Sequence, residues 1–343
     1  MRFRQLAKRA TLLLGLVAVT VIASGSAFEY FARQQAYRQF RAPGQLVNVG
    51  GGRHLQVDCR GAGAPTVVLE SGLDNYGSLA WTSVQDAIAK QHRVCAYSRA
   101  GIMWSDPSRT SFDSREAMQQ LHTALIGAGE SAPWLMVGHS LGGAYITTFT
   151  KLYPEEVGGL VYVDASHPNQ FARYRTAVGK SIAPSATEVR IGAALAWTGV
   201  LRLLPTANQP ATWPEALATA APAFLGTSLG ALARETEAIP STLAEADAGR
   251  ALGDRALVVL SAGKAQGAAE LTQMGLTADQ GALLFAAHLA LAADMATWST
   301  RGRLEVVAGA SHYIQLDRPD VVIAAVFEVG RYVTGHDTGA RRW

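Results

Sequence analysis

The chain has 343 residues, of which 49% are hydrophobic and 17% charged, and this composition excludes an intrinsically disordered protein. The net charge of +3 is unevenly spread: residues 1–45 hold seven Arg or Lys and one Glu, a net of +6, so the remainder carries 3 − 6 = −3. A mildly acidic body without a basic stripe disfavours nucleic-acid binding. The length allows one large domain with an insertion, or two small domains.

The first 28 residues have the pattern of a membrane-targeting segment. An uncharged, mostly apolar run from Ala10 to Phe28 is close to the length that spans a bilayer, and it follows four basic residues, Arg2, Arg4, Lys8 and Arg9. This charge bias predicts a retained anchor with the folded domain outside the cytoplasm, in the periplasm or at the cell surface. The alternative is secretion after signal cleavage, since Gly25 to Ala27 are small. Residues 29–45 are predicted to be a polar, partly helical linker.

The body of the chain alternates strand and helix patterns. A hairpin is expected at residues 46–59, and buried strands are expected at residues 66–70, 93–97, 134–138, 159–164, 256–261 and 303–307. Helical patterns between the strands indicate parallel pairing in a three-layer α/β core, assigned to residues 46–166 and 251–335. Residues 167–250 are rich in Ala, Leu and Pro and are predicted to form a helical cap, and residues 336–343 a loose tail.

Ser140 is the candidate nucleophile. An apolar strand stops at this serine, which stands between Gly138 and Gly142, and a helical pattern follows at once. A strand that turns directly into a helix places the middle residue in a strained conformation that only small neighbours permit. Such a turn exposes the hydroxyl at the N-terminal end of a helix, where a backbone N–H can stabilise a developing oxyanion.

The same Gly-x-Ser-x-Gly spacing occurs a second time, around Ser228. This copy lies in an alanine-rich stretch without a preceding strand pattern, so we interpret it as part of a helix or loop.

His312 is the candidate base, because a Gly-Ala-Ser-His loop after the last predicted strand places its imidazole at the same sheet edge as Ser140.

Taken together, these motifs resemble the α/β-hydrolase fold family, in particular serine esterases and lipases. The resemblance covers about residues 45–335 and rests on five stretches: Glu70-Ser-Gly72, Arg93 to Gly101, Gly138 to Gly143, Val163 to Pro168, and Gly309 to His312. It implies a mostly parallel sheet of about eight strands flanked by helices, with the helical cap inserted after the sixth strand. It implies no metal and no organic cofactor.

The acid of the expected triad departs from the usual family pattern. Most members carry it after the seventh strand, but that position here reads Ser261-Ala-Gly-Lys264. Asp164, at the end of the sixth strand, resembles the placement in pancreatic-type lipases and is the preferred candidate. Asp279 is the rival, although its surroundings are typical of a helix-capping box.

The resemblance also implies an oxyanion hole and a disulfide. The loop after the third strand is expected to supply the backbone N–H of Leu73, which would act with that of Leu141. In this family the second and fourth strands run antiparallel beside each other, and here they carry Cys59 and Cys95, so a disulfide between them is expected.

The expected activity is hydrolysis of a small carboxylic ester with an apolar acyl or aromatic group through an acyl-enzyme intermediate. Two alternatives remain open from the sequence. One keeps the triad for cofactor-free haloperoxidase, lyase or carbon–carbon hydrolase chemistry. The other is a non-catalytic ligand-sensing or partner-binding domain.

Overall fold

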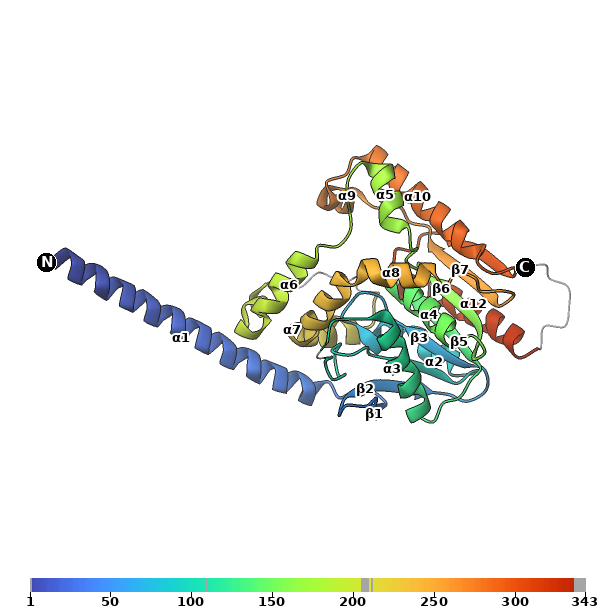
Figure 1. Ribbon diagram of the computed structural model, residues 1–343, viewed down its shortest axis with the longest axis horizontal. Helices are drawn as coiled ribbons and strands as arrows, with labels where there is room; N and C mark the ends of the chain where they lie inside the picture. Colours follow the sequence, from blue (N-terminus) through green and yellow to red (C-terminus); the bar gives the residue numbers. More distant parts are fainter. Residues whose placement is uncertain (1, 109, 205–209, 211, 336–343) are drawn as a thin grey trace.

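A computed structural model describes residues 2–108, 110–204, 210 and 212–335 of the chain. Within these residues, one sheet of eight strands lies between layers of helices, and a long N-terminal helix projects from the body (Figure 1). The expected tail at 336–343 lies outside the described residues. The strands are β1 (Gln45–Asn48), β2 (His54–Arg60), β3 (Thr66–Glu70), β4 (Val94–Tyr97), β5 (Trp134–His139), β6 (Val157–Val163), β7 (Ala256–Ala262) and β8 (Gly302–Val307).

The described α-helices include short and long members. They are α1 (Arg2–Gln39), α2 (Gln85–Ile88), α3 (Ser114–Gly127), α4 (Leu141–Leu152), α5 (Gln170–Val178), α6 (Ala186–Leu195), α7 (Glu215–Glu237), α8 (Ile239–Asp247), α9 (Ala268–Met274), α10 (Ala278–Ala296), α11 (Ile314–Asp317) and α12 (Pro319–Val333). Three 3₁₀ helices join them: η1 (Gly77–Trp81), η2 (Ala196–Thr198) and η3 (Val200–Leu203).

The strand order is β1-β2-β4-β3-β5-β6-β7-β8. Strands β3 to β8 pair in parallel, as the expected crossovers require, and β2 pairs antiparallel with both β1 and β4. From β3 the chain crosses first to β4 on one side and then to β5 on the other. This reversal opens a crevice at the carboxyl end of β3, the place where α/β sheets bind ligands.

The sheet is buried on both faces, which explains its continuous apolar strands. One face packs against α3, α4, α8 and α10 through side chains such as Leu121, Tyr145 and Leu243. The other packs against η1, α2 and α12 through Trp81, Ile88 and Val326. These two cores hold the strand ends that carry the candidate site.

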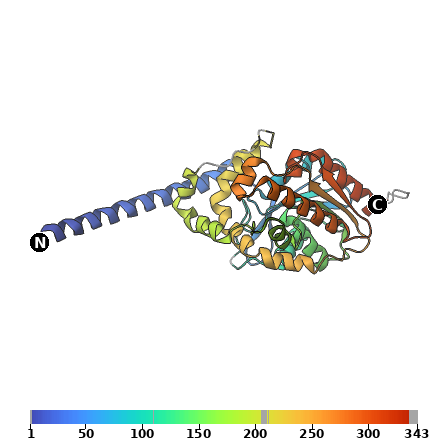
Figure 2. The same ribbon diagram turned by 90° about the horizontal axis from the view of Figure 1, so that it is seen from above.

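Helices α5 to α8 lie between β6 and β7 in the chain and form two groups in space. Helix α5 contacts α10, whereas α6 and α7 contact each other and α8 contacts α3 and α4. Figures 1 and 2 show α6 and α7 at the end of the body from which α1 projects. The inserted segment therefore covers the sheet edge from one side and meets the N-terminal helix on the other.

The predicted linker at residues 29–45 is helical as far as Gln39, and this helical part is continuous with the membrane-targeting segment. Helix α1 runs unbroken to Gln39, and its last turns pack on the cap: Ala36 is buried, and the Tyr37 ring meets Phe224 of α7 edge-on at 5.1 Å. Glu29 is also buried, in ion pairs described below. Of the polar side chains in this stretch, Glu29 is buried in an ion pair while Gln34, Gln35 and Arg38 are exposed, and a single sequence does not distinguish the two environments.

Two of the described helices, α1 and α7, are long and apolar enough to cross a membrane, and the sharply bent pair α9–α10 could count as a third span. Helix α7 has nine buried side chains and packs within the cap, and α9–α10 pack on the body. In the apolar window of α1, by contrast, no residue is buried. Helix α1 is therefore compatible with a membrane anchor.

Cys59 and Cys95 lie directly opposite each other in antiparallel β2 and β4 and form a disulfide. It closes a loop with a sequence separation of 36 residues. A closed loop has fewer unfolded conformations, so the bond stabilises the folded state chiefly by restricting the unfolded chain.

We expect the Cys59→Ser/Cys95→Ser variant to lose about 4 kcal/mol of unfolding free energy, because a loop of this length gives that entropy cost. Urea unfolding of the detergent-solubilised full chain, followed by tryptophan fluorescence, measures the loss. The wild-type chain under a strong reductant is the matched control and should unfold at the midpoint of the variant. Identical midpoints for the oxidised wild type and the variant would show that the bond contributes nothing.

Candidate active site

Ser140 occupies a sharp turn between β5 and α4. Its backbone has φ 53° and ψ −125°, a conformation that costs about 1–3 kcal/mol for a residue with a side chain. The turn depends on its glycines: a Cβ added to Gly138 would lie 2.6 Å from the carbonyl oxygen of Gly142, and one added to Gly142 would lie 2.6 Å from that of Glu70. The packing of these backbones thus holds the hydroxyl at the sheet edge.

The structure brings together the three residues expected to form a triad. His312 Nε2 lies 2.9 Å from Ser140 Oγ, and His312 Nδ1 lies 2.6 Å from Asp164 Oδ2. Asp164 is buried, whereas the imidazole of His312 is half exposed. Because the carboxylate accepts, Nδ1 carries the hydrogen and Nε2 is free to accept the serine proton. The chain of atoms has the geometry of a nucleophile, a base and an orienting acid.

Asp164 is held by donors from three elements. It follows β6 in a left-handed conformation with φ 46°, and its Oδ1 accepts from the backbone N–H of Ala262 at 2.7 Å and from His288 Nε2 at 2.9 Å. Burial alone would raise the pKa of Asp164, but the hydrogen bonds from His288 and His312 outweigh it and lower that pKa far below its usual range. The carboxylate is therefore ionised at neutral pH.

His288 is a residue of the site that sequence reasoning missed. It lies on α10, and its Nδ1 is 3.0 Å from the hydroxyl of Tyr174 on α5. Its Nε2 also lies 3.2 Å from Ser261 Oγ, at the end of β7. Burial lowers the pKa of His288, but Asp164 more than offsets this and the net pKa is raised. No short-range motif marks this residue, because α10 brings it to the sheet edge from 27 residues beyond Ser261.

Asp279 lies apart from this network. It stands exposed in the first turn of α10, where Thr277 and Gln280 form the capping box that its surroundings indicated. Ser228 lies inside α7, and its buried hydroxyl accepts from the backbone N–H of Met103 at 3.1 Å. The second Gly-x-Ser-x-Gly stretch therefore belongs to a helix, one of the two interpretations given from the sequence.

The loop after β3 lies against the nucleophile. A Cβ added to Gly72 would approach Ser140 Cβ to 2.9 Å and His139 Nδ1 to 3.1 Å, so only glycine fits without a shift. The next residue, Leu73, is one expected oxyanion donor, and Leu141, the first residue of α4, is the other. Leu141 directly follows Ser140 in the chain, and Leu73 directly follows Gly72, which lies against Ser140.

Arg99 fixes that loop from behind. Its guanidinium donates to the carbonyl oxygens of Ser71 at 2.8 Å and Gly72 at 2.7 Å, and it pairs with Glu70 at 2.6 Å and with Glu235 of α7 at 2.7 Å. All three charged side chains are buried. One cation therefore joins the loop, the end of β3 and the cap.

The cluster around Arg99 holds two carboxylates against one guanidinium. Glu70 also accepts a short hydrogen bond from the Tyr97 hydroxyl. Burial raises the pKa of Glu70 from 4.5 to about 7, since Arg99 and Tyr97 compensate only in part. At neutral pH Glu70 is therefore close to half protonated.

His139 joins the nucleophile turn to the base. Its Nε2 donates to the backbone carbonyl of His312 at 2.9 Å, and the two rings lie 4.7 Å apart. Burial, and then the nearby His312, lower the pKa of His139 to about 3, so it stays neutral. A neutral imidazole here supports the His312 loop without placing a second charge beside it.

A cavity of about 480 Å³ opens over Ser140, His312 and Asp164. Its walls come from α5, the α5–α6 loop, α9 and α10, and they are largely apolar, with Phe171, Tyr174, Ile182, Met274, Leu284 and Phe285. Lys264 and Gln266 add polar groups at the β7 side. The space suits a small molecule with an apolar part next to the candidate nucleophile.

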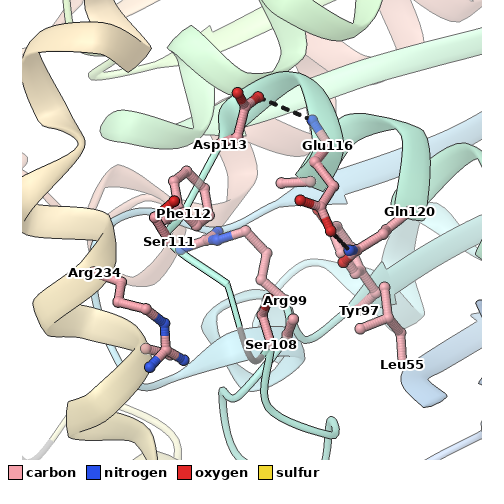
Figure 3. Close-up of a pocket in the computed structure, with 13 residues that line it drawn as sticks. Leu55, Tyr97, Arg99, Ser108, Ser111, Phe112, Asp113, Glu116, Gln120 and Arg234 are labelled. Atoms are coloured by element: carbon pink, nitrogen blue, oxygen red, sulfur yellow. Dashed lines mark hydrogen bonds between the residues drawn. The ribbon is translucent and has the colours of Figure 1, made fainter. Parts of the chain in front are cut away.

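A second hollow, between the start of α3 and α7, has room for about one water molecule, at about 20 Å³ (Figure 3). Three of its polar side chains are hydrogen-bonded: Asp113 accepts from the backbone N–H of Glu116, and the Glu116 carboxylate accepts from the side chain of Gln120. Arg99 and Tyr97 also border it. We interpret this hollow as part of the support for the Arg99 cluster.

The raised pKa of Glu70 predicts a specific pH dependence of stability. Between pH 4.5 and about 7 the folded protein retains a proton that the unfolded chain has released. This contribution is therefore fully present below pH 4.5 and is lost as the pH rises through about 7. We expect the stability of the wild type, relative to Glu70→Gln, to fall across this window, as measured by urea unfolding at each pH.

Glu70→Gln is the control for other titrating groups, because His139 and Asp164 contribute equally to both proteins. The informative quantity is the difference between the two unfolding free energies as a function of pH. Parallel curves for the two proteins would mean that Glu70 does not titrate in this window.

Comparison with known proteins agrees with the fold. The putative carbamate hydrolase RutD of Cronobacter sakazakii is 30% identical over 103 residues, which are 30% of this chain and 38% of that protein. The chain spans half or less of the length of the curated relatives it matches. Each of these is therefore a partial match.

Solved structures resemble the chain over most of its length. A putative lipase from Acinetobacter baumannii superposes with a TM-score of 0.62 at 15% identity, covering 90% of this chain and 97% of that one. An esterase from Exiguobacterium antarcticum gives a TM-score of 0.60 at 16% identity, covering 85% and 99%. At these identities the likeness is one of fold. The sequence profile of the alpha/beta hydrolase family matches residues 21–325, and the chain belongs to that family.

Proposed function

We propose that the protein is a serine hydrolase that cleaves a carboxylic ester with an apolar acyl or aromatic group. The observation that carries the proposal is the contact of Ser140 Oγ with His312 Nε2, together with the bond of that imidazole to Asp164. If Ser140 only formed a tight turn between a strand and a helix, it would need neither His312 nor Asp164. The hydrogen-bonded series Ser140, His312 and Asp164 borders an apolar cavity, and this is the arrangement that acyl transfer requires.

In the proposed mechanism, His312 takes the proton of Ser140 as its hydroxyl attacks the ester carbonyl. Asp164 stabilises the imidazolium that results, and the N–H groups of Leu73 and Leu141 stabilise the oxyanion. His312 then returns the proton to the leaving alcohol. Water, activated by the same imidazole, hydrolyses the acyl-enzyme and restores the serine.

The proposed location is outside the cytoplasm, with α1 as a membrane anchor. Basic residues before the apolar run favour this orientation. The Cys59–Cys95 disulfide also supports it, because such bonds persist in oxidising compartments. The partners proposed are therefore a small-molecule ester and the lipid bilayer.

The nucleophile can be tested against its sequence rival. Ser140→Ala should abolish labelling by a fluorophosphonate probe and lower ester turnover by about 10⁴-fold or more, since the attacking oxygen is lost. Ser228→Ala is the matched control and should label as the wild type does. A series of p-nitrophenyl esters of increasing chain length then maps the cavity. Undiminished turnover in Ser140→Ala would refute the proposal, and a wild type inert to every ester would favour the sensor alternative.

His288 is expected to be a positioning residue that acts through Asp164. His288→Leu removes a hydrogen bond to a charged group, worth about 1.5–3 kcal/mol, so kcat should fall roughly tenfold or more while KM stays unchanged. His288→Gln, which keeps an N–H donor, should recover part of kcat. Steady-state kinetics and thermal unfolding of both variants measure this. Equal losses of kcat in both variants, in step with lost stability, would assign His288 a purely structural role.

A further inference from the structure

The cap carries an exposed apolar surface on residues 191–204. This segment, the end of α6 with η2 and η3, has Arg202 as its one charged residue. Six large apolar side chains on it are exposed by 41–79%: Ile191, Leu195, Trp197, Val200, Leu203 and Leu204. We call these six the cap apolar face. So many adjacent exposed apolar side chains are unusual on a soluble surface and indicate a contact with another apolar phase.

This face lies directly beside α1. A Cβ added to Gly25 would be 2.2 Å from the carbonyl oxygen of Thr198, and one added to Gly199 would be 2.7 Å from that of Gly25. The backbones of η2 and α1 therefore touch where two glycines permit it. Figures 1 and 2 show α6 next to α1 in both views. The cap apolar face is thus continuous with the exposed apolar surface of α1.

A cluster of charged side chains stabilises the contact between the cap and α1. Arg202 Nε pairs with Glu29 Oε2 at 2.5 Å, and Arg33 Nε pairs with Glu29 Oε1 at 2.6 Å. Glu29 is buried, and Arg33 also donates to the carbonyl oxygen of Gly226 in α7 at 3.3 Å. Arg202 thus shares the buried carboxylate of Glu29 with Arg33 and is not an unpaired charge, which lowers the cost of placing the segment beside an apolar phase.

The level at which the cap contacts α1 determines how deep the cap lies relative to the bilayer. At a rise of about 1.5 Å per residue, the apolar run from Ala10 to Phe28 extends about 28 Å, which matches the hydrocarbon core of a bilayer. Gly25 lies three residues before the outer end of that run. The cap meets α1 at this level, so its apolar side chains stand at the outer boundary of the membrane.

We propose that the cap apolar face inserts into the outer leaflet of the bilayer that α1 spans, as a second membrane contact. The inference rests on the proposed anchoring by α1 and adds to it. Trp197 has the amphipathic ring typical of the membrane interface, and the leucines reach the acyl region. Two contacts fix the cap against the membrane surface, so the protein does not pivot freely about its anchor.

Depth-dependent quenching tests this with three variants of the full chain that each add one free cysteine: Val17→Cys on α1, Leu203→Cys on the cap apolar face and Ile126→Cys on α3. All three native side chains are exposed, and both native cysteines are in the disulfide. Each variant carries an NBD label in phosphatidylcholine nanodiscs, with or without nitroxide lipids. Labels at 17 and 203 should lose about half of their fluorescence or more, because both would lie within the lipid, and the label at 126 should not.

The outcomes separate the two proposals. Quenching at position 17, with position 203 as unquenched as position 126, would overturn the membrane contact of the cap and leave the anchor intact. An unquenched label at 17 would overturn the anchor itself. If position 203 is unquenched and Leu203→Cys chains cross-link to each other under mild oxidation, the face binds a second copy of the chain instead of lipid.

Discussion

The buried carboxylate of Asp164 is the constraint on which the candidate site depends. An ionised group at this depth is stable only if donors surround it. His312, His288 and the N–H of Ala262 supply them, from the loop after β8, from α10 and from β7. The need to satisfy one charge thus fixes three elements relative to the end of β6. The orientation of the imidazole that meets Ser140 follows from that arrangement.

Arg99 imposes a second constraint, on the other side of the nucleophile. It binds the carbonyl groups of the loop next to Ser140 and, through Glu235, the cap helix α7. Removing either carboxylate would leave a buried charge only partly paired, which is costly. The loop that borders the nucleophile and the cap therefore cannot move independently. This coupling gives the cap a physical role beyond covering the cavity.

The sequence predicted what short-range patterns encode. The turn at Ser140 needs small residues within two positions, and the apolar strands and their crossovers define the sheet, so both could be predicted. Asp164 required a choice between two carboxylates, and of the two it is Asp164 that lies within hydrogen-bonding distance of His312. His288 and Glu235 reach the site from separate helices, and no spacing rule connects them to it. Residues 29–45 were predicted to be partly helical, but the packing of that helix on the cap was not predicted, because Glu29 is polar in sequence and buried in an ion pair.

The placement of the cap relates the anchor to the cavity. Helix α6 begins at Ala186, and the preceding Ala183 and Pro184 line a groove of about 630 Å³ between α5 and α8. Phe171 and Pro184 also line the cavity over Ser140, so the two spaces are adjacent. The same helix continues to the cap apolar face. The cap apolar face, proposed to lie in the outer leaflet, and the groove that adjoins the apolar cavity thus lie at the two ends of one helix.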